Sequence, residues 1–162
     1  MKYISTIAAF ALFCIGAPAL AQDAGQIERV KHGASCAKCN LFQADFSFKD
    51  MPGRNFSHAR LRQSDLSLST MNGSNFSGAD LSVSNLFGGR FTGASFHDAN
   101  LQGAVMVGGY FGGADFTGAN LSGALISGAN MQGAKLKQAQ LHDVCGDEST
   151  MLPAGLTVAH CR

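Results

Sequence analysis

The fold is decided by residues 99–123, which read ANLQG-AVMVG-GYFGG-ADFTG-ANLSG. The third residue of each group of five is large and apolar, and the first is Ala or Gly. Counted outward in steps of five, the large apolar residue recurs without interruption from Leu41 to Leu141. All twenty-one positions are Leu, Phe, Met or Ile. The position two residues earlier is mostly Ala or Ser, and the position two residues later is Gly in twelve repeats.

A period of five fits neither of the common secondary structures. A helix repeats every 3.6 residues and a strand every 2, so neither keeps these residues on one face. Short extended segments that turn at every repeat do keep them there, because each turn resets the alternation. The large residue and the small one two positions before it then both point inward. Gly suits the corner, where the turn needs unusual backbone angles.

The large residues form four homogeneous columns when the sequence is read in steps of twenty. The columns are Leu41, Leu61, Leu81, Leu101, Leu121 and Leu141; Phe46, Leu66, Leu86, Met106 and Ile126; Met51, Met71, Phe91, Phe111 and Met131; and Phe56, Phe76, Phe96, Phe116 and Leu136. Parallel coils stack like side chains on like at a spacing of about 4.8 Å. We therefore expect four repeats per coil and about five coils over residues 41–142.

Several repeats resemble those of the pentapeptide-repeat family, whose pattern is a small residue, Asp or Asn, Leu or Phe, a polar residue and Gly. The best matches are 79–82, 99–103 and 119–123, which read ADLS, ANLQG and ANLSG. The resemblance covers about 100 residues, and it implies an all-β fold, a right-handed quadrilateral β-helix. Lys49 and Arg54 depart from the pattern at the small inward position. We expect looser first coils there, with both side chains reaching outward.

Residues 1–21 have the pattern of a secretory signal peptide. Lys2 precedes an almost wholly apolar run at 4–16, and Ala19 and Ala21 are small residues at the two positions that signal peptidase reads. The apolar run is too short for a membrane anchor, because a bilayer core is about 30 Å thick. We expect cleavage after Ala21 and a periplasmic or secreted protein that makes no membrane contact.

Four cysteines remain after cleavage: Cys36 and Cys39 precede the repeats, and Cys145 and Cys161 follow them. An oxidising compartment favours disulfides. Because a disulfide joins Cα atoms less than about 7 Å apart, it cannot bridge the two ends of the rod. We therefore expect Cys36–Cys39, with Cys39 buried, and Cys145–Cys161. The alternatives for Cys36 and Cys39 are a redox pair, which normally opens a helix, and a metal site, which needs further ligands nearby.

The predicted organisation has four parts: a signal peptide at 1–21, an N-terminal cap with the Cys-x-x-Cys motif at 22–40, the β-helix at 41–142 and a disulfide-closed C-terminal cap at 143–162. The segment from Cys145 to Cys161 looks like a tail common in exported family members. It would cover the open edge of the last coil and stop end-to-end growth. Ile27 and Val30 stand at helical spacing and predict a short capping helix within 26–32.

No catalytic or metal-binding constellation is visible in the sequence. His58, His97 and His142 fall in different columns and coils, and Asp45 and Asp65 are the only directly stacked Asp pair. Asp and Asn at this position of the repeat satisfy backbone donors at turns. The Gly-rich segments lack the helix that must follow a phosphate-binding loop. We expect no enzyme activity, no cofactor and no bound metal.

One surface patch indicates a protein contact. Val105 and Leu125 are neighbours in an outward column that usually holds Asp or Asn, Phe87 and Val107 stack beside them, and Tyr110 lies around the corner. A contiguous apolar patch of this kind is typical of an interaction site. The alternative is the ordinary hydrophobicity that many protein surfaces show.

The charge balance narrows the function. Twelve Lys and Arg oppose eleven Asp and Glu, for a net charge of +1, so neither the basic footprint of a nucleic-acid binder nor the acidic surface of a nucleic-acid mimic is present. We expect an exported scaffold or protein-binding module whose partner is another protein or a second copy. The resemblance implies an alternative, because some family members mimic DNA and protect topoisomerases; those proteins are cytosolic, acidic and dimeric. A redox protein using Cys36 and Cys39 is the third possibility.

Overall fold

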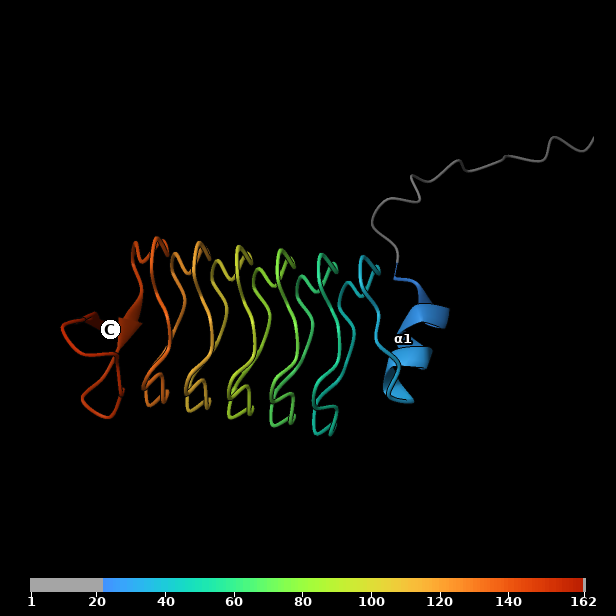
Figure 1. Cartoon of the computed structure of the whole chain (residues 1–162), viewed down its shortest axis with the longest axis horizontal. Helices are drawn as coiled ribbons and strands as arrows, with labels where there is room; N and C mark the ends of the chain where they lie inside the picture. The colour runs from blue at the N-terminus through green and yellow to red at the C-terminus, as the bar shows by residue number, and fades with distance from the viewer. Residues whose placement is uncertain (1–21, 162) are drawn as a thin grey trace, which may run out of the picture.

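The protein is a rod of stacked coils with a short helix at one end and a folded tail at the other (Figure 1). The structure, a computed structural model, describes residues 22–161, and the predicted signal peptide at 1–21 lies outside the described residues. The elements are α1 (Ala24–Lys31), β1 (Cys145–Gly146) and β2 (Ala159–His160). Strands β1 and β2 pair in parallel, with Cys145 opposite Ala159.

Parallel bridges between residues twenty apart join each coil to the next. They begin at Asn40↔Arg60 and recur at every fifth residue through Leu125↔Cys145. The predicted step of four repeats per coil is therefore confirmed, while the number of coils stays a prediction. The last bridge joins Asn130 to Met151, so one extra residue is accommodated there. Each bridge is one residue long because the chain turns again at once, so these sides are not extended strands.

Every backbone N–H of a typical repeat has an acceptor. In residues 100–104, the N–H groups of Asn100, Leu101 and Gly103 donate to carbonyl oxygens of the neighbouring coils at 2.7–2.9 Å. The Ala104 N–H closes the turn on the Leu101 carbonyl oxygen at 3.0 Å. The fifth, that of Gln102, donates to Oδ1 of Asn100 at 3.2 Å. The amide side chain at the second position of the repeat thus satisfies the one donor that the backbone leaves over.

The inward columns form one continuous core. The large residues are buried from Leu41 through Met131, whereas Leu136 and Leu141 at the last coil are only partly buried. Rings of the Phe column stack coil on coil: Phe76 lies 5.1 Å from Phe96 between ring centroids, and Phe96 lies 4.8 Å from Phe116, with interplanar angles of 5°. Offset-stacked rings at this spacing add stability beyond the burial of their area.

Two glycines in the small inward column make room for aromatic rings. A Cβ at Gly109 would lie 2.5 Å from the ring of Phe111, and a Cβ at Gly89 would lie 2.5 Å from the ring of Phe91. The large column that contains Phe91 and Phe111 has Met at residues 51, 71 and 131, and the small position two residues before each Met is Lys, Ser or Ala. Gly therefore occurs in this column only where a Phe ring turns back toward it.

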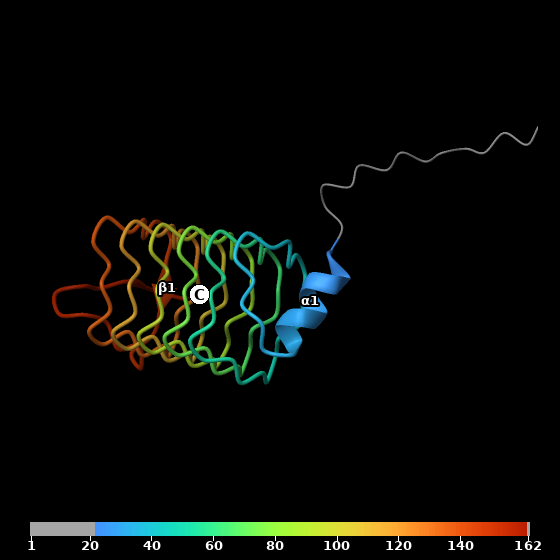
Figure 2. The same ribbon diagram turned by 45° about the vertical axis from the view of Figure 1, so that its right-hand side comes forward.

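Helix α1 closes the N-terminal end of the rod, lying across the first coil (Figure 2). Asp23 begins the helix by accepting the Gln26 N–H at 3.0 Å. Ile27 and Val30 are the buried residues of the helix, so the predicted capping helix is confirmed, two residues earlier at its start.

The first coils are not looser than the others, contrary to the expectation from Lys49 and Arg54. The bridges Asp50↔Thr70 and Asn55↔Asn75 follow the same register as the rest. Both basic side chains belong to half-buried residues. Arg54 does not reach outward: its Nε is buried, and its Nη2 would lie 3.5 Å from a Cβ at Gly33, just after α1. The guanidinium thus fills space beside the carboxyl end of the helix, where a positive charge is favourable.

A disulfide staples each end of the rod. Cys36 is joined to Cys39, and Cys145 to Cys161, with Cα atoms 5.5 and 4.8 Å apart. Cys36 is buried and Cys39 only half-buried. The expectation that Cys39 would be buried is therefore wrong, because the small inward position of the first coil has no coil beneath it.

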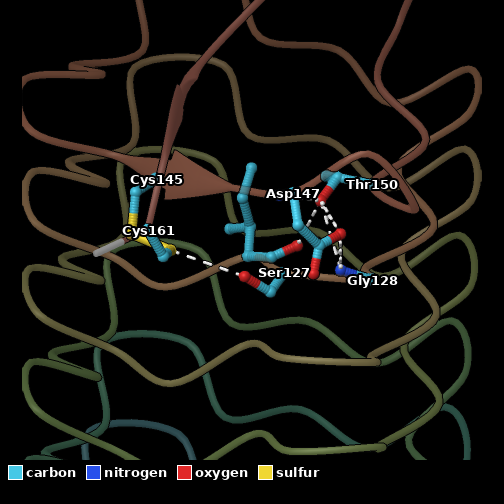
Figure 3. Close-up of a disulfide and its surroundings, with 7 residues drawn as sticks. Ser127, Gly128, Cys145, Asp147, Thr150 and Cys161 are labelled. Atoms are coloured by element: carbon cyan, nitrogen blue, oxygen red, sulfur yellow. Dashed lines mark hydrogen bonds between the residues drawn. A yellow bond between two sulfur atoms is a disulfide. The ribbon is translucent and has the colours of Figure 1, made fainter.

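The C-terminal tail is tied to the last coil beside its disulfide (Figure 3). The carboxylate of Asp147 accepts the N–H groups of Gly128 and Ser149 at 3.1 and 3.0 Å and the Ser149 hydroxyl at 2.6 Å. The Ser149 hydroxyl is the main reason why the pKa of Asp147 is lowered to about 2. The Ser127 hydroxyl lies 3.4 Å from Sγ of Cys161. These bonds hold the tail against the last coil, where Leu152 and Val158 pack on the core.

Gly109→Ala is expected to lower the free energy of unfolding by about 1–3 kcal/mol, because the new methyl overpacks against the Phe111 ring. Gly112→Ala is the matched control: its Cβ would meet only the Gln132 carbonyl oxygen at 3.7 Å, so the change should be neutral or slightly stabilising. Urea unfolding measures both. Adding Phe111→Met to Gly109→Ala should recover part of the loss. If the changes in the free energy of unfolding caused by Gly109→Ala and Phe111→Met simply add, the Phe111 ring is not the reason why residue 109 is Gly.

Cys145→Ser with Cys161→Ser is expected to release the tail while the coils stay folded. The disulfide spans a sequence separation of 16, and a loop of that size contributes about 3 kcal/mol. Hydrogen exchange should rise over residues 147–161 and remain slow at the core of the coils. Cys36→Ser with Cys39→Ser is the control at the opposite end and should leave the exchange of 147–161 unchanged. Unaltered tail protection in the first variant would show that the hydrogen bonds alone hold the tail.

Candidate interaction surface

The five predicted patch residues lie on adjacent coils. Val105 is bridged to Leu125, and the Gly88 N–H donates to the Val107 carbonyl oxygen at 2.9 Å, which places Phe87 beside Val107. Phe87 is 47% exposed and Leu125 39%. Val105 and Val107 are half-buried. The patch is therefore continuous along the rod.

Tyr110 belongs to the next face and extends the patch around the corner. Its side chain is exposed, and the guanidinium of Arg90, one coil back, lies 5.3 Å from the centroid of its ring. Arg90 is bridged to Tyr110, so the two side chains stack on successive coils. The cation on the ring holds the aromatic side chain at the edge of the patch.

Phe48 and Leu68 extend the patch toward the N-terminal end, and the sequence interpretation missed them. Phe48 is 74% exposed and Leu68 46%. The Leu68 N–H donates to the Phe87 carbonyl oxygen at 2.8 Å, and the Leu68 side chain lies over Gly88, where a Cβ would come 2.7 Å from its Cδ2. The signal was present, because large apolar residues stand where later coils have Gly. We call the whole set the apolar strip: Phe48, Leu68, Phe87, Val105, Val107, Tyr110 and Leu125.

Phe48 and Leu68 hold backbone angles that side chains disfavour. Their φ angles are 58° and 56°, in the left-handed region, and the same corner in later coils is Gly88, Gly108 and Gly128. A side chain in this conformation costs about 1–2 kcal/mol relative to Gly. Exposed apolar side chains at a strained backbone position do not help the isolated rod fold.

The N-terminal end of the apolar strip carries two stacked carboxylates, with Lys31 and Lys49 close enough to act on the charge of Asp45. Asp45 is bridged to Asp65, in the same outward column that later holds Val105 and Leu125. The Asp45 carboxylate accepts the hydroxyl and the N–H of Ser47 at 2.7 and 2.9 Å. These hydrogen bonds, with smaller contributions from nearby lysines, lower the pKa of Asp45 below its ordinary value. The carboxylate therefore stays charged at neutral pH.

A shallow hollow lies on another side of the rod from the apolar strip. Phe42, Arg60, Arg62 and Gln63 line it, and the Arg60 guanidinium lies 5.8 Å from the centroid of the Phe42 ring. Arg62 and Gln63 are exposed. The hollow is open and confined to two coils, whereas the apolar strip extends over successive coils from Phe48 to Leu125.

The three histidines of the repeats do not converge. His97 and His142 each lie beside the next residue in sequence, with Nδ1 3.0 Å from Asp98 and 2.7 Å from Asp143. His58 lies over Gly78 on another coil. Within residues 22–161, no three His, Cys, Asp or Glu side chains are grouped so that they could hold a metal ion. No helix in that part of the chain is long and apolar enough to cross a membrane.

Two family models match the chain. Both are described as pentapeptide repeats, one of eight copies over residues 55–86 and one of nine copies over residues 91–135. Among curated proteins, none matches the sequence. The matched residues include Val107 and Tyr110, whereas Phe87 lies in the short gap between the two matches.

Several solved structures are similar to this chain. A pentapeptide repeat protein from the Arabidopsis thaliana thylakoid lumen is 30% identical over 54% of this chain and 63% of its own, with a TM-score of 0.52. The pentapeptide repeat protein Rfr23 from the cyanobacterium Cyanothece 51142 is 26% identical over 67% and 64%, with a TM-score of 0.37. QnrB1, a plasmid-mediated fluoroquinolone resistance protein, is 16% identical over 68% and 80%, with a TM-score of 0.32.

The matched part of this chain spans less than two thirds of the length of the first two of these proteins. The likeness to the thylakoid lumen protein implies the fold of that family, a right-handed quadrilateral β-helix. With the period of five, the twenty-residue step of the bridges and both family matches, the chain belongs to the pentapeptide-repeat family.

Proposed function

We propose that this protein is an exported, non-enzymatic module that binds another protein through the apolar strip. The observation that carries the proposal is the exposure of Phe48, Leu68 and Phe87 in one continuous line of neighbouring coils. A contiguous exposed apolar surface is where protein interfaces are found. The core of the rod is filled by side chains, so the outer faces are what remains for recognition.

The composition of the apolar strip supports binding over chance hydrophobicity. Val105 and Leu125 occupy a position where Asn100 and Asn120 each accept a backbone N–H of their own turn. Val and Leu have no acceptor to offer, so the two repeats give up that hydrogen bond. The backbone at Phe48 is also left-handed, which a side chain disfavours. On several successive coils, therefore, the residues of the strip are less favourable for folding than the usual residues of the repeat.

Export is the part of the proposal that rests on the N-terminal sequence and on the cysteines. Residues 1–21 have the pattern of a signal peptide. The two disulfides, Cys36–Cys39 and Cys145–Cys161, suit an oxidising compartment. A DNA-mimicking role is disfavoured, because twelve basic residues oppose eleven acidic ones.

Phe87→Asp with Val107→Asp is expected to abolish association while leaving thermal stability nearly unchanged, because both side chains lie on the outer face. The test is native mass spectrometry of unreduced protein from the exported fraction. The measured mass reports signal cleavage, the loss of four hydrogen atoms on formation of two disulfides, and the number of chains in the assembly. Gln102→Asp with Ser122→Asp is the control, at the same position of the repeat on another face.

A complex that survives Phe87→Asp with Val107→Asp unchanged would exclude the apolar strip as the binding surface. A chain that retains residues 1–21 after purification from that fraction would contradict cleavage and leave the binding result to be judged separately.

A further inference from the structure

We propose that the occupant of the apolar strip is an amphipathic α-helix of a different protein, lying along the rod with a Lys or Arg over Asp45 and Asp65. The inference rests on the proposed binding function and specifies the partner. The two ends of the apolar strip differ in chemistry. One end carries the stacked carboxylates of Asp45 and Asp65, and the other carries only the apolar side chains of Val105 and Leu125 in the same column.

The spacing of the coils favours a helix. Exposed or half-buried apolar side chains of the strip recur on each successive coil, about every 4.8 Å along the rod. A helix presents one turn of side chains every 5.4 Å, whereas an extended peptide presents same-face side chains about 6.6 Å apart. The strip runs over five successive coils, from Phe48 to Leu125, or about 19 Å. About 13 residues of helix cover that length.

Strand addition is excluded along the apolar strip, because its backbone has no free edge. The Val105 N–H donates to the Ser84 carbonyl oxygen at 2.9 Å, and the Val105 carbonyl oxygen accepts the Leu86 N–H at 2.7 Å. The Phe87 carbonyl oxygen accepts from Leu68 in the same way. A partner therefore has to bind through side chains, as the apolar face of an amphipathic helix does.

A second copy of this chain is a poor occupant. Two antiparallel copies paired about the middle coil would place Asp65 against Val105 and Asp45 against Leu125 of the other copy. Two parallel copies would place the Asp45 and Asp65 column of one copy against the corner that carries Phe48 and Leu68 in the other. Both arrangements bury carboxylates against apolar groups, which is unfavourable. A basic residue of another protein avoids this difficulty and gives the complex one orientation.

Phe48→Gly with Leu68→Gly is the decisive variant, because it removes the apolar anchors without harming the fold. Later coils have Gly at this corner with φ angles of 60–65°, so Gly relieves the strained backbone and thermal stability should hold or rise. Val83→Gly is the matched control. Val83 is also exposed, with a φ of 56°, but lies at a different corner of the rod.

The probe is a synthetic 18-residue helical peptide with Leu at i, i+4, i+7 and i+11 and two Lys beside one end of the Leu stripe; a second peptide has Glu in place of Lys. Isothermal titration calorimetry on the oxidised, mature chain should show the Lys peptide binding at least about tenfold more tightly than the Glu peptide. Asp45→Asn with Asp65→Asn should remove that preference. Phe48→Gly with Leu68→Gly should weaken binding about tenfold or more, and Val83→Gly should not.

Three outcomes would overturn the inference. They are no binding of the Lys peptide, equal binding of the two peptides, and equal weakening by Val83→Gly and by Phe48→Gly with Leu68→Gly. A homodimer that Phe87→Asp with Val107→Asp dissolves would also overturn it while sustaining the proposed binding function. Peptide binding that is indifferent to Phe87 and Val107 would instead contradict the proposed function itself.

Discussion

The interaction on which the rest of this protein depends is the backbone hydrogen bond between coils. In each typical repeat, three N–H groups bond to the coils on either side, one closes the turn, and one is accepted by an Asp or Asn side chain, as in residues 100–104. These bonds hold successive coils in register, with a step of twenty residues from coil to coil, so like side chains stack on like. The Phe column shows the result, with ring centroids about one coil spacing apart at Phe76, Phe96 and Phe116.

Different side chains stabilise the fold and form the candidate binding surface. Inward side chains and the Asp or Asn that accepts the turn N–H carry the fold, whereas the other outward side chains contribute little to it. A rod built this way can hold an apolar strip on one face without disturbing its core. The ends are the weak points, because the terminal coils have no neighbour on one side. Helix α1, the two disulfides and the hydrogen bonds of Asp147 close them, which agrees with the need of repeat proteins for capping.

The candidate surface follows from exceptions to the repeat. Val105 and Leu125 stand where Asn would satisfy a donor, and Phe48 and Leu68 stand where Gly would relax the backbone. A single exception of this kind is ordinary, but these exceptions are contiguous on the rod and combine with an acidic end at Asp45. The physical case for binding lies in that combination. The charge balance gives no sign of a nucleic-acid partner, and the disulfide-closed ends are compatible with the proposed export.

The sequence alone determined the period of five, the twenty-residue step, the inward columns, the capping helix and the core of the apolar strip, because regular stacking makes distance along the chain equivalent to position in space. Local departures required the tertiary structure. Gly109 is explained only by the course of the Phe111 ring, and Arg54 by the space beside α1. The sequence shows large apolar residues at the Phe48 corner, but only the structure shows that Phe48 is exposed and that Leu68 lies over Gly88 beside Phe87. Periodic hydrogen bonding can be read from sequence, whereas the packing of irregular side chains depends on contacts between coils that no repeat pattern encodes.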